Sequence, residues 1–157
     1  MSRFLGVLLA CLLLFSGDLK AQEHSAQIEY LNKWVGTWTF DTLEGETECE
    51  KVGDYIVDCR TTWKTASGAE REAVFITRFD PETETFLGYR FYSTGSASYG
   101  PGWIDGDTDV FIYDMPGGTR AKVNQTWSGE KLTYEWYRST QGGPWVKTSE
   151  GSWTKVR

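Results

Sequence analysis

Residues able to carry out acid–base or nucleophilic chemistry are few in this sequence. The chain of 157 residues contains a single histidine, His24, which precedes all of the strand-like segments. Ser-His-Asp and Cys-His catalysis both need an imidazole beside the nucleophile, so neither is expected in the body of the domain. We expect His24 itself to lie in solvent near the start of the mature chain. The sequence predicts no catalytic residue, no metal site and no cofactor.

Two groups of carboxylates still have spacings that could do chemistry. The run Asp105-Gly106-Asp107-Thr108-Asp109 alternates acids as a calcium loop does. An EF-hand next needs a glycine and later a bidentate glutamate, but Val110 and Pro116 stand at those positions. We therefore expect an acidic hairpin turn, with a weak ion site of another geometry as the alternative.

Glu135, between Tyr134 and Trp136, is the first acid to consider for a pair that hydrolyses glycosidic bonds. Alternation along a strand places acids routinely on the wet face of a sheet. A hydrolase or isomerase that uses carboxylates is therefore ranked third, below two hypotheses in which the protein only binds a ligand.

Export is predicted by the first 21 residues. Arg3 precedes the uninterrupted apolar run 4–15, and small residues follow, which is typical of a cleaved signal peptide that ends near Ala21. The apolar run is too short for a comfortable membrane span. Cys11 resembles a lipoprotein cysteine but comes early, so lipidation is the minor alternative. The prediction is a periplasmic or extracellular domain over residues 22–157.

Charge and the remaining cysteines agree with export. The chain carries a net charge of −6 and should repel phosphate backbones, so nucleic acid and anionic membrane surfaces are poor partners. Cys49 and Cys59 form an even pair for an oxidising compartment, which predicts a disulfide. The oligomeric state is left open.

The elements that position these residues are mostly strands. Ile28, Leu31, Trp34 and Val35 have helical spacing and predict one short helix that ends at Gly36. Short β-rich runs with turn residues between them follow. The predicted strands are 37–42, 46–52, 55–64, 70–79, 85–93, 97–104, 108–114, 119–127, 131–139 and 145–155. An all-β antiparallel meander of eight to ten strands results, either closed as a barrel or stacked as a sandwich.

Two hairpins can be placed in register. Centring the first on Asp54 pairs Cys49 with Cys59, where strand separation suits a disulfide. The second folds Phe79 onto Phe86. Of its two faces, the more uniformly apolar one is predicted to be the interior, and it holds Val74, Ile76, Leu87, Tyr89 and Phe91, with Arg78 near the turn.

Gly36-Thr37-Trp38 stands at the entrance to the first strand. Glycine lets the chain turn from helix to strand, and the tryptophan closes one end of a barrel. A short helix, then Leu31-x-x-Trp34-Val35-Gly36-Thr37-Trp38, then a meander resembles the lipocalin-like (calycin) superfamily. More closely, it resembles a family of bacterial exported domains of unknown function with this Gly-x-Trp opening.

The resemblance implies a closed barrel with a cavity for a small apolar ligand. It also implies that Trp38 packs under a C-terminal cation, either Lys155 or Arg157. Another Gly-x-Trp barrel family binds haem through a late histidine, but this chain has none there.

Aromatic residues supply the functional signal. All eight tryptophans and eight tyrosines follow the signal peptide, and most are expected in the core. A few, with Arg78 or Arg138 as a polar anchor, are predicted to line a cavity. The predicted ligand-binding residues are Ile76, Arg78, Leu87, Tyr89, Phe91, Tyr134, Trp136 and Arg138. The leading hypothesis is an exported binding protein for a small apolar molecule, and the second is a carbohydrate- or surface-interaction domain with exposed aromatics.

Overall fold

The structure is a computed structural model that describes residues 24–157. The predicted signal peptide (1–21) and Cys11 lie outside these residues. One helix, α2 (Ser25–Trp34), is followed by ten strands. They are β1 (Gly36–Phe40), β2 (Gly45–Lys51), β3 (Ile56–Lys64), β4 (Glu70–Asp80), β5 (Thr85–Tyr92), β6 (Ala97–Asp105), β7 (Thr108–Met115), β8 (Thr119–Ser128), β9 (Lys131–Thr140) and β10 (Val146–Lys155).

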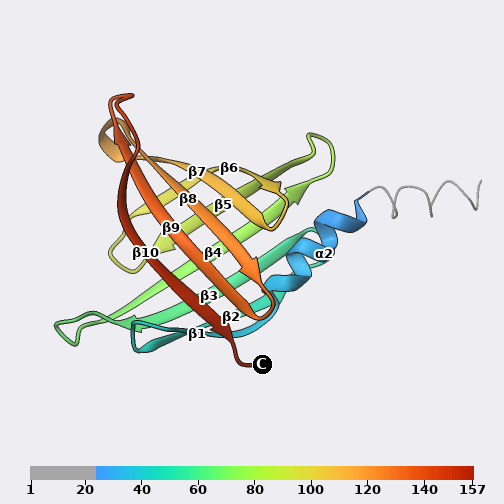
Figure 1. The fold of residues 1–157 in the computed structure, drawn as a ribbon, viewed down its shortest axis with the longest axis horizontal. Helices are drawn as coiled ribbons and strands as arrows, with labels where there is room; N and C mark the ends of the chain where they lie inside the picture. The colour runs from blue at the N-terminus through green and yellow to red at the C-terminus, as the bar shows by residue number, and fades with distance from the viewer. Residues whose placement is uncertain (1–23) are drawn as a thin grey trace, which may run out of the picture.

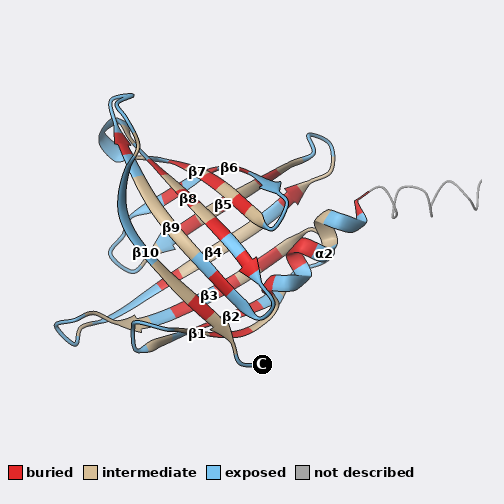
Figure 2. Cartoon of the chain, viewed as in Figure 1, coloured by how far each residue is buried: buried red, intermediate tan, exposed pale blue. Residues whose placement is uncertain are grey.

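The strands form a closed antiparallel barrel (Figure 1). Each strand pairs with its neighbours in sequence, and β1 pairs with β10 to complete the circle. The predicted all-β meander and its single helix are confirmed, and the barrel is correct rather than the sandwich. Buried and exposed positions alternate along the strands, as a barrel wall requires (Figure 2).

The seam between β1 and β10 is short, because only Trp38–Lys155, Thr39–Thr154 and Phe40–Trp153 are paired. Side chains reinforce it. The Asp41 carboxylate accepts hydrogen bonds from the Lys131 ammonium (2.6 Å), the Ser152 hydroxyl (2.6 Å) and the Thr154 hydroxyl (2.9 Å). These bonds lower the pKa of Asp41 to about 2, with the bond from Lys131 as the largest cause. The loop after β1 is therefore tied to both β9 and β10.

The predicted hairpin registers are both correct. Cys49 pairs with Cys59 across β2 and β3, and a disulfide joins them. Phe79 pairs with Phe86 across β4 and β5. The disulfide agrees with an exported protein.

The face predicted to be the interior of the second hairpin is wrong. Phe79 and Phe86 are buried in the barrel, whereas Phe91 is 47% exposed on the outside. The reason is the register with β3, which pairs the inward Cys59 with Phe75. Paired residues project to the same side of a sheet, so the disulfide and not the local composition decides which face of β4 points inwards.

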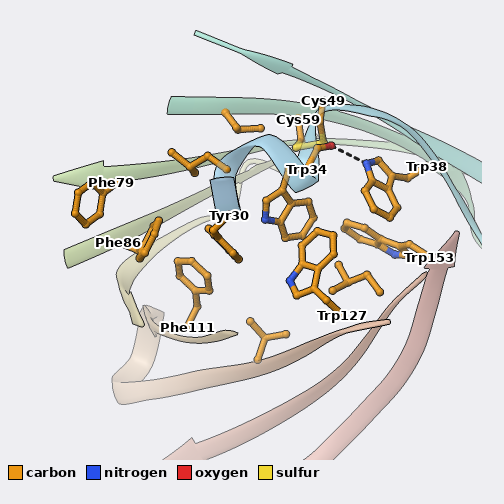
Figure 3. Close-up of a cluster of buried hydrophobic side chains, with 14 of the residues drawn as sticks. Tyr30, Trp34, Trp38, Cys49, Cys59, Phe79, Phe86, Phe111, Trp127 and Trp153 are labelled. Carbon is orange, nitrogen blue, oxygen red and sulfur yellow. Dashed lines mark hydrogen bonds between the residues drawn. A yellow bond between two sulfur atoms is a disulfide. The ribbon is translucent and has the colours of Figure 1, made fainter. Parts of the chain in front are cut away.

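Helix α2 closes one end of the barrel with aromatic side chains (Figure 3). The Trp34 ring meets the rings of Trp127 and Trp153 edge-to-face at centroid distances of 5.0 and 5.8 Å. The Trp38 indole N–H donates to the main-chain oxygen of Trp34 (2.7 Å). The helix is thus anchored by the same tryptophans that fill this end.

His24, at the N-terminal cap of α2, is buried, although the sequence predicted that it would lie in solvent. It is 9% exposed, and its ring lies 5.2 Å from that of Phe79 and 6.3 Å from that of Tyr55. The imidazole is thus covered by Tyr55 of the β2–β3 turn and by Phe79 near the end of β4.

The cation over Trp38 is Lys155, whose ammonium lies 5.5 Å from the ring centroid. Arg157 contributes through its main chain, because its carbonyl accepts from the Thr37 N–H (2.8 Å). Gly36 makes this approach possible. Its φ is +130°, and a Cβ there would lie 2.1 Å from the Arg157 carbonyl oxygen.

Substituting Gly36→Ala should therefore open the seam. We expect a loss of unfolding free energy of about 3 kcal/mol or more, from a disfavoured backbone angle together with a steric clash. The matched control is Gly53→Ala, where φ is +71° but nothing lies within 4 Å of the added Cβ. The control should lose about 1 kcal/mol. Equal losses in urea unfolding would show that the close approach at Gly36 is unimportant.

Candidate ligand-binding site

A cavity of about 190 Å³ lies inside the barrel, beyond the aromatic end closed by α2. It is lined by Phe40, Leu43, Thr61, Trp63, Phe75, Arg90, Tyr92, Val123, Gln125, Tyr134, Trp136 and Trp153. This lining is mainly apolar and aromatic, as is usual for small-molecule sites, which typically measure about 300–1,000 Å³. The volume fits a small molecule or the end of a larger one.

Leu43 marks the mouth of the cavity. It lies in the turn between β1 and β2 and is 41% exposed, although it lines the hollow. A second hollow of about 320 Å³ shares Tyr92 and Trp136 with the first and contains Arg138. The end of the barrel away from α2 is therefore recessed, while the α2 end is packed.

Arg90, on β5, is the one charged residue of the cavity lining. It is 8% exposed. Its guanidinium carbon lies 4.7 Å from the ring centroid of Phe75 and 4.8 Å from those of Tyr113 and Trp136. Such cation–π contacts stabilise a desolvated guanidinium by roughly 2 kcal/mol.

The pKa of Arg90 reflects two opposing effects. Burial lowers it, but the nearby side chains of Tyr113 and Tyr92 raise it by more, so the net shift is upward. Arg90 therefore keeps its charge at any physiological pH. A permanent cation is thus held in the wall of an apolar cavity.

A second buried charge, Asp109, lies at the α2 end. One of its carboxylate oxygens accepts both the Tyr30 hydroxyl (2.8 Å) and the Trp127 indole N–H (2.9 Å). The other oxygen has no hydrogen-bond partner among the described residues. Burial raises the pKa of Asp109 from 3.8 to about 6, although both hydrogen bonds and the charge of Arg90 act against the shift. The predicted acidic turn at 105–109 thus ends in an interior residue that fastens α2.

Two of the predicted ligand-binding residues line the cavity, namely Tyr134 and Trp136. Arg138 lies in the neighbouring hollow and is exposed. Arg78, Tyr89 and Arg138 do not share one interior, since both arginines are exposed.

The other predictions fall on the outward face of β4 and β5. Arg78 is exposed and lies 3.8 Å from the Asp80 carboxylate. Leu87 and Phe91 also lie on this face, and Ile76 and Tyr89 border only a void of about 20 Å³. The sequence analysis did not identify Phe75, Arg90 and Tyr92 as cavity residues. Cys59 points inwards and pairs with Phe75, which in turn pairs with Arg90, so this register would have placed all three inside.

Glu135 lies away from the cavity. Its carboxylate accepts from the Lys147 ammonium (2.7 Å) and the Tyr137 hydroxyl (2.7 Å). These bonds lower the pKa of Glu135, with the bond from Lys147 as the largest cause. A general acid needs the opposite shift, so this position gives no support to the hydrolase hypothesis.

Residues 24–157 contain no group of three or more histidine, cysteine or acidic side chains arranged to hold a metal ion. None of the helical structure described has the length and apolar character to cross a membrane.

The fold defines a closed ten-stranded antiparallel barrel with one helix over one end. Among solved structures, the chain is similar to the crystal structure of Rv2717c from M. tuberculosis, with a TM-score of 0.61 and 14% sequence identity. The match covers 83% of this chain and 98% of that one. At this identity the likeness extends to the fold alone. No family model and no curated protein matches the sequence.

The pKa of Asp109 predicts a pH dependence of stability. Since the folded protein holds this proton more tightly than the unfolded chain, the stabilisation is complete below about pH 4 and is lost as the pH rises through about 6. A pKa difference of about two units corresponds to about 3 kcal/mol. Asp109→Asn can keep both hydrogen bonds to its oxygen without this titration.

The quantity to measure is the unfolding free energy of Asp109→Asn minus that of the wild type. We expect this difference to rise by about 3 kcal/mol from pH 4 to pH 8. The matched control is Asp114→Asn, an exposed position on β7 that faces Arg120. A difference for Asp109→Asn that does not change with pH would contradict the assignment.

Proposed function

We propose that this protein is an exported binding protein that holds a small, largely apolar molecule inside its barrel. The observation that carries the proposal is the contrast between the two ends. Four tryptophans and α2 fill one end, whereas an aromatic-lined hollow with Leu43 at its mouth remains at the other. Small barrels fill their interior with side chains or hold one small ligand, and this barrel does the first at one end only.

The lining favours binding over catalysis. The residues that line the cavity include no carboxylate, imidazole or thiol. The Thr61 hydroxyl is engaged with that of Thr47 at 2.9 Å. A molecule in this space would meet rings, aliphatic groups and a few polar contacts, which favour orientation of a ligand over catalysis.

The signal-peptide pattern of residues 1–21 and the Cys49–Cys59 disulfide both favour a periplasmic or extracellular site of action. The resemblance of the Gly36-Thr37-Trp38 opening to calycin-like exported domains favours ligand binding, and the closed barrel is compatible with it.

A neutral probe, octan-1-ol, tests the proposal by titration calorimetry or tryptophan fluorescence. Leu43→Ser should weaken binding about fivefold, because a ligand at the mouth would complete the burial of this half-exposed side chain, worth about 1 kcal/mol. Val52→Ser is the matched control, since Val52 is also an exposed turn residue but lies outside the cavity lining. No binding to the wild type, together with empty protein in native mass spectra from its own host, would refute the proposal.

A second candidate function rests on the outer face of β4 to β7. Phe91, Tyr99 and Trp103 are 47%, 63% and 46% exposed. Tyr89 pairs with Tyr99, and Val74 pairs with Phe91, so these side chains form one outward apolar surface. Contiguous exposed apolar surface on a domain commonly marks an interaction site. A carbohydrate whose rings stack on Tyr99 and Trp103 is the second candidate ligand.

The two functions can be separated by crossed variants. Tyr99→Ala should weaken glycan binding at least threefold through loss of stacking, and it should leave octan-1-ol binding unchanged. Leu43→Ser should show the reverse pattern. A glycan array followed by titration, with quenching of tryptophan fluorescence as the signal, provides the measurement. A Tyr99→Ala protein that binds glycans as the wild type does would eliminate the second candidate.

A further inference from the structure

Arg90 carries a charge that no acidic side chain of residues 24–157 neutralises directly. The ion pairs within this part of the chain involve other residues. The Nε atom of Arg90 is buried and has no hydrogen-bond partner among the described residues. Buried charged groups are normally paired and fully hydrogen-bonded, because the desolvation of an ion is expensive. Arg90 and Asp109 both depart from this rule among the described residues, and of the two only Arg90 lines the cavity.

Asp109 does not fill the role of partner. Its carboxylate is engaged by Tyr30 and Trp127 at the α2 end, and it forms no ion pair with Arg90. The charge of Arg90 does act on Asp109 at longer range, where it opposes the upward shift of the Asp109 pKa. A long-range interaction of this kind leaves the Nε donor of Arg90 without a partner among the described residues.

The side chains around Arg90 leave its charge free to bind a ligand in the cavity. Phe75, Tyr113 and Trp136 hold the guanidinium by cation–π contacts and keep it in place without an acid. Arg90 and Tyr92 both line the cavity, so a guanidinium and a phenol lie in a lining that is otherwise mainly apolar and aromatic. A planar guanidinium binds a carboxylate through two parallel hydrogen bonds, and such bonds are strong where water is excluded.

We propose that the cavity selects a small apolar monocarboxylate, whose carboxylate binds Arg90 and whose hydrocarbon part extends towards Leu43. This inference rests on the proposed function, and it adds the charge of the ligand and its orientation. The aromatic groups Trp63, Tyr134 and Trp153 would surround the hydrocarbon part. A neutral molecule of the same length would leave the guanidinium unpaired and should bind less tightly.

The test compares octanoate with octan-1-ol, which have the same chain length and differ in the head group. Both are titrated at pH 8 into the wild type and into Arg90→Met, which keeps an unbranched side chain without the charge. We expect the wild type to bind octanoate at least tenfold more tightly than octan-1-ol. Arg90→Met should lose at least tenfold in affinity for octanoate and should no longer prefer octanoate to octan-1-ol.

A merely structural role for Arg90 predicts a different result. In that case Arg90→Met would weaken both ligands together and leave their ratio unchanged, which would overturn the inference. Arg90→Lys keeps a charge without the planar fork, so it should retain a reduced preference for octanoate. If Arg90→Met does not fold, the wild-type comparison and Arg90→Lys still decide the question.

The inference and the proposed function fail in different ways. Equal or tighter binding of octan-1-ol by the wild type would overturn the carboxylate inference and support the apolar cavity. Binding of neither probe would overturn both. Octanoate binding that Arg90→Met retains in full would place the carboxylate elsewhere and would also overturn the inference.

Discussion

Closure of the sheet between β1 and β10 is the constraint on which the other features depend. Once these strands pair, each strand has two neighbours, and each side chain is committed to the interior or to the outside. The seam itself has only three residue pairs, so it relies on local help. Gly36 lets the chain approach Arg157, and Asp41 ties the loop after β1 to β9 and β10. The short helix before Gly36 then lies over one end of the barrel.

The interior divides into two halves with different physical character. At the α2 end, large rings pack edge-to-face and surround Asp109, whose two donors come from Tyr30 on α2 and Trp127 on β8. At the other end, aromatic rings line a hollow beside Arg90. The helix end therefore supplies the fixed packing that lets the opposite end remain recessed without loss of the fold.

Local patterns in the sequence predicted the elements and both hairpin registers, because turn residues and alternation act over a few residues. They failed for the inward face of β4 and β5. Whether Phe91 or Arg90 points inwards depends on the pairing of β4 with β3. Cys59 on β3 points inwards, and its partner Phe75 therefore does so as well. The composition of the β4–β5 hairpin alone favoured its more apolar face, with Ile76 and Leu87, as the interior. Composition takes no account of the pairing with the neighbouring strand. Tyr134 and Trp136 do line the hollow, and they alternate on β9 with Thr133, Glu135 and Tyr137.

Alternation along β5 also links the buried cation to the exposed aromatic surface. Arg90 and Phe91 are adjacent, so β5 points a cation inwards and an aromatic ring outwards, the reverse of what burial energies favour for each residue alone. The packing of Phe79 and Phe86 inside the barrel and the disulfide at Cys49–Cys59 hold this arrangement. Where a fold keeps a local arrangement against its intrinsic preferences, function is the usual reason. The inward cation and the outward aromatic surface are for this reason the two places at which a ligand is best sought.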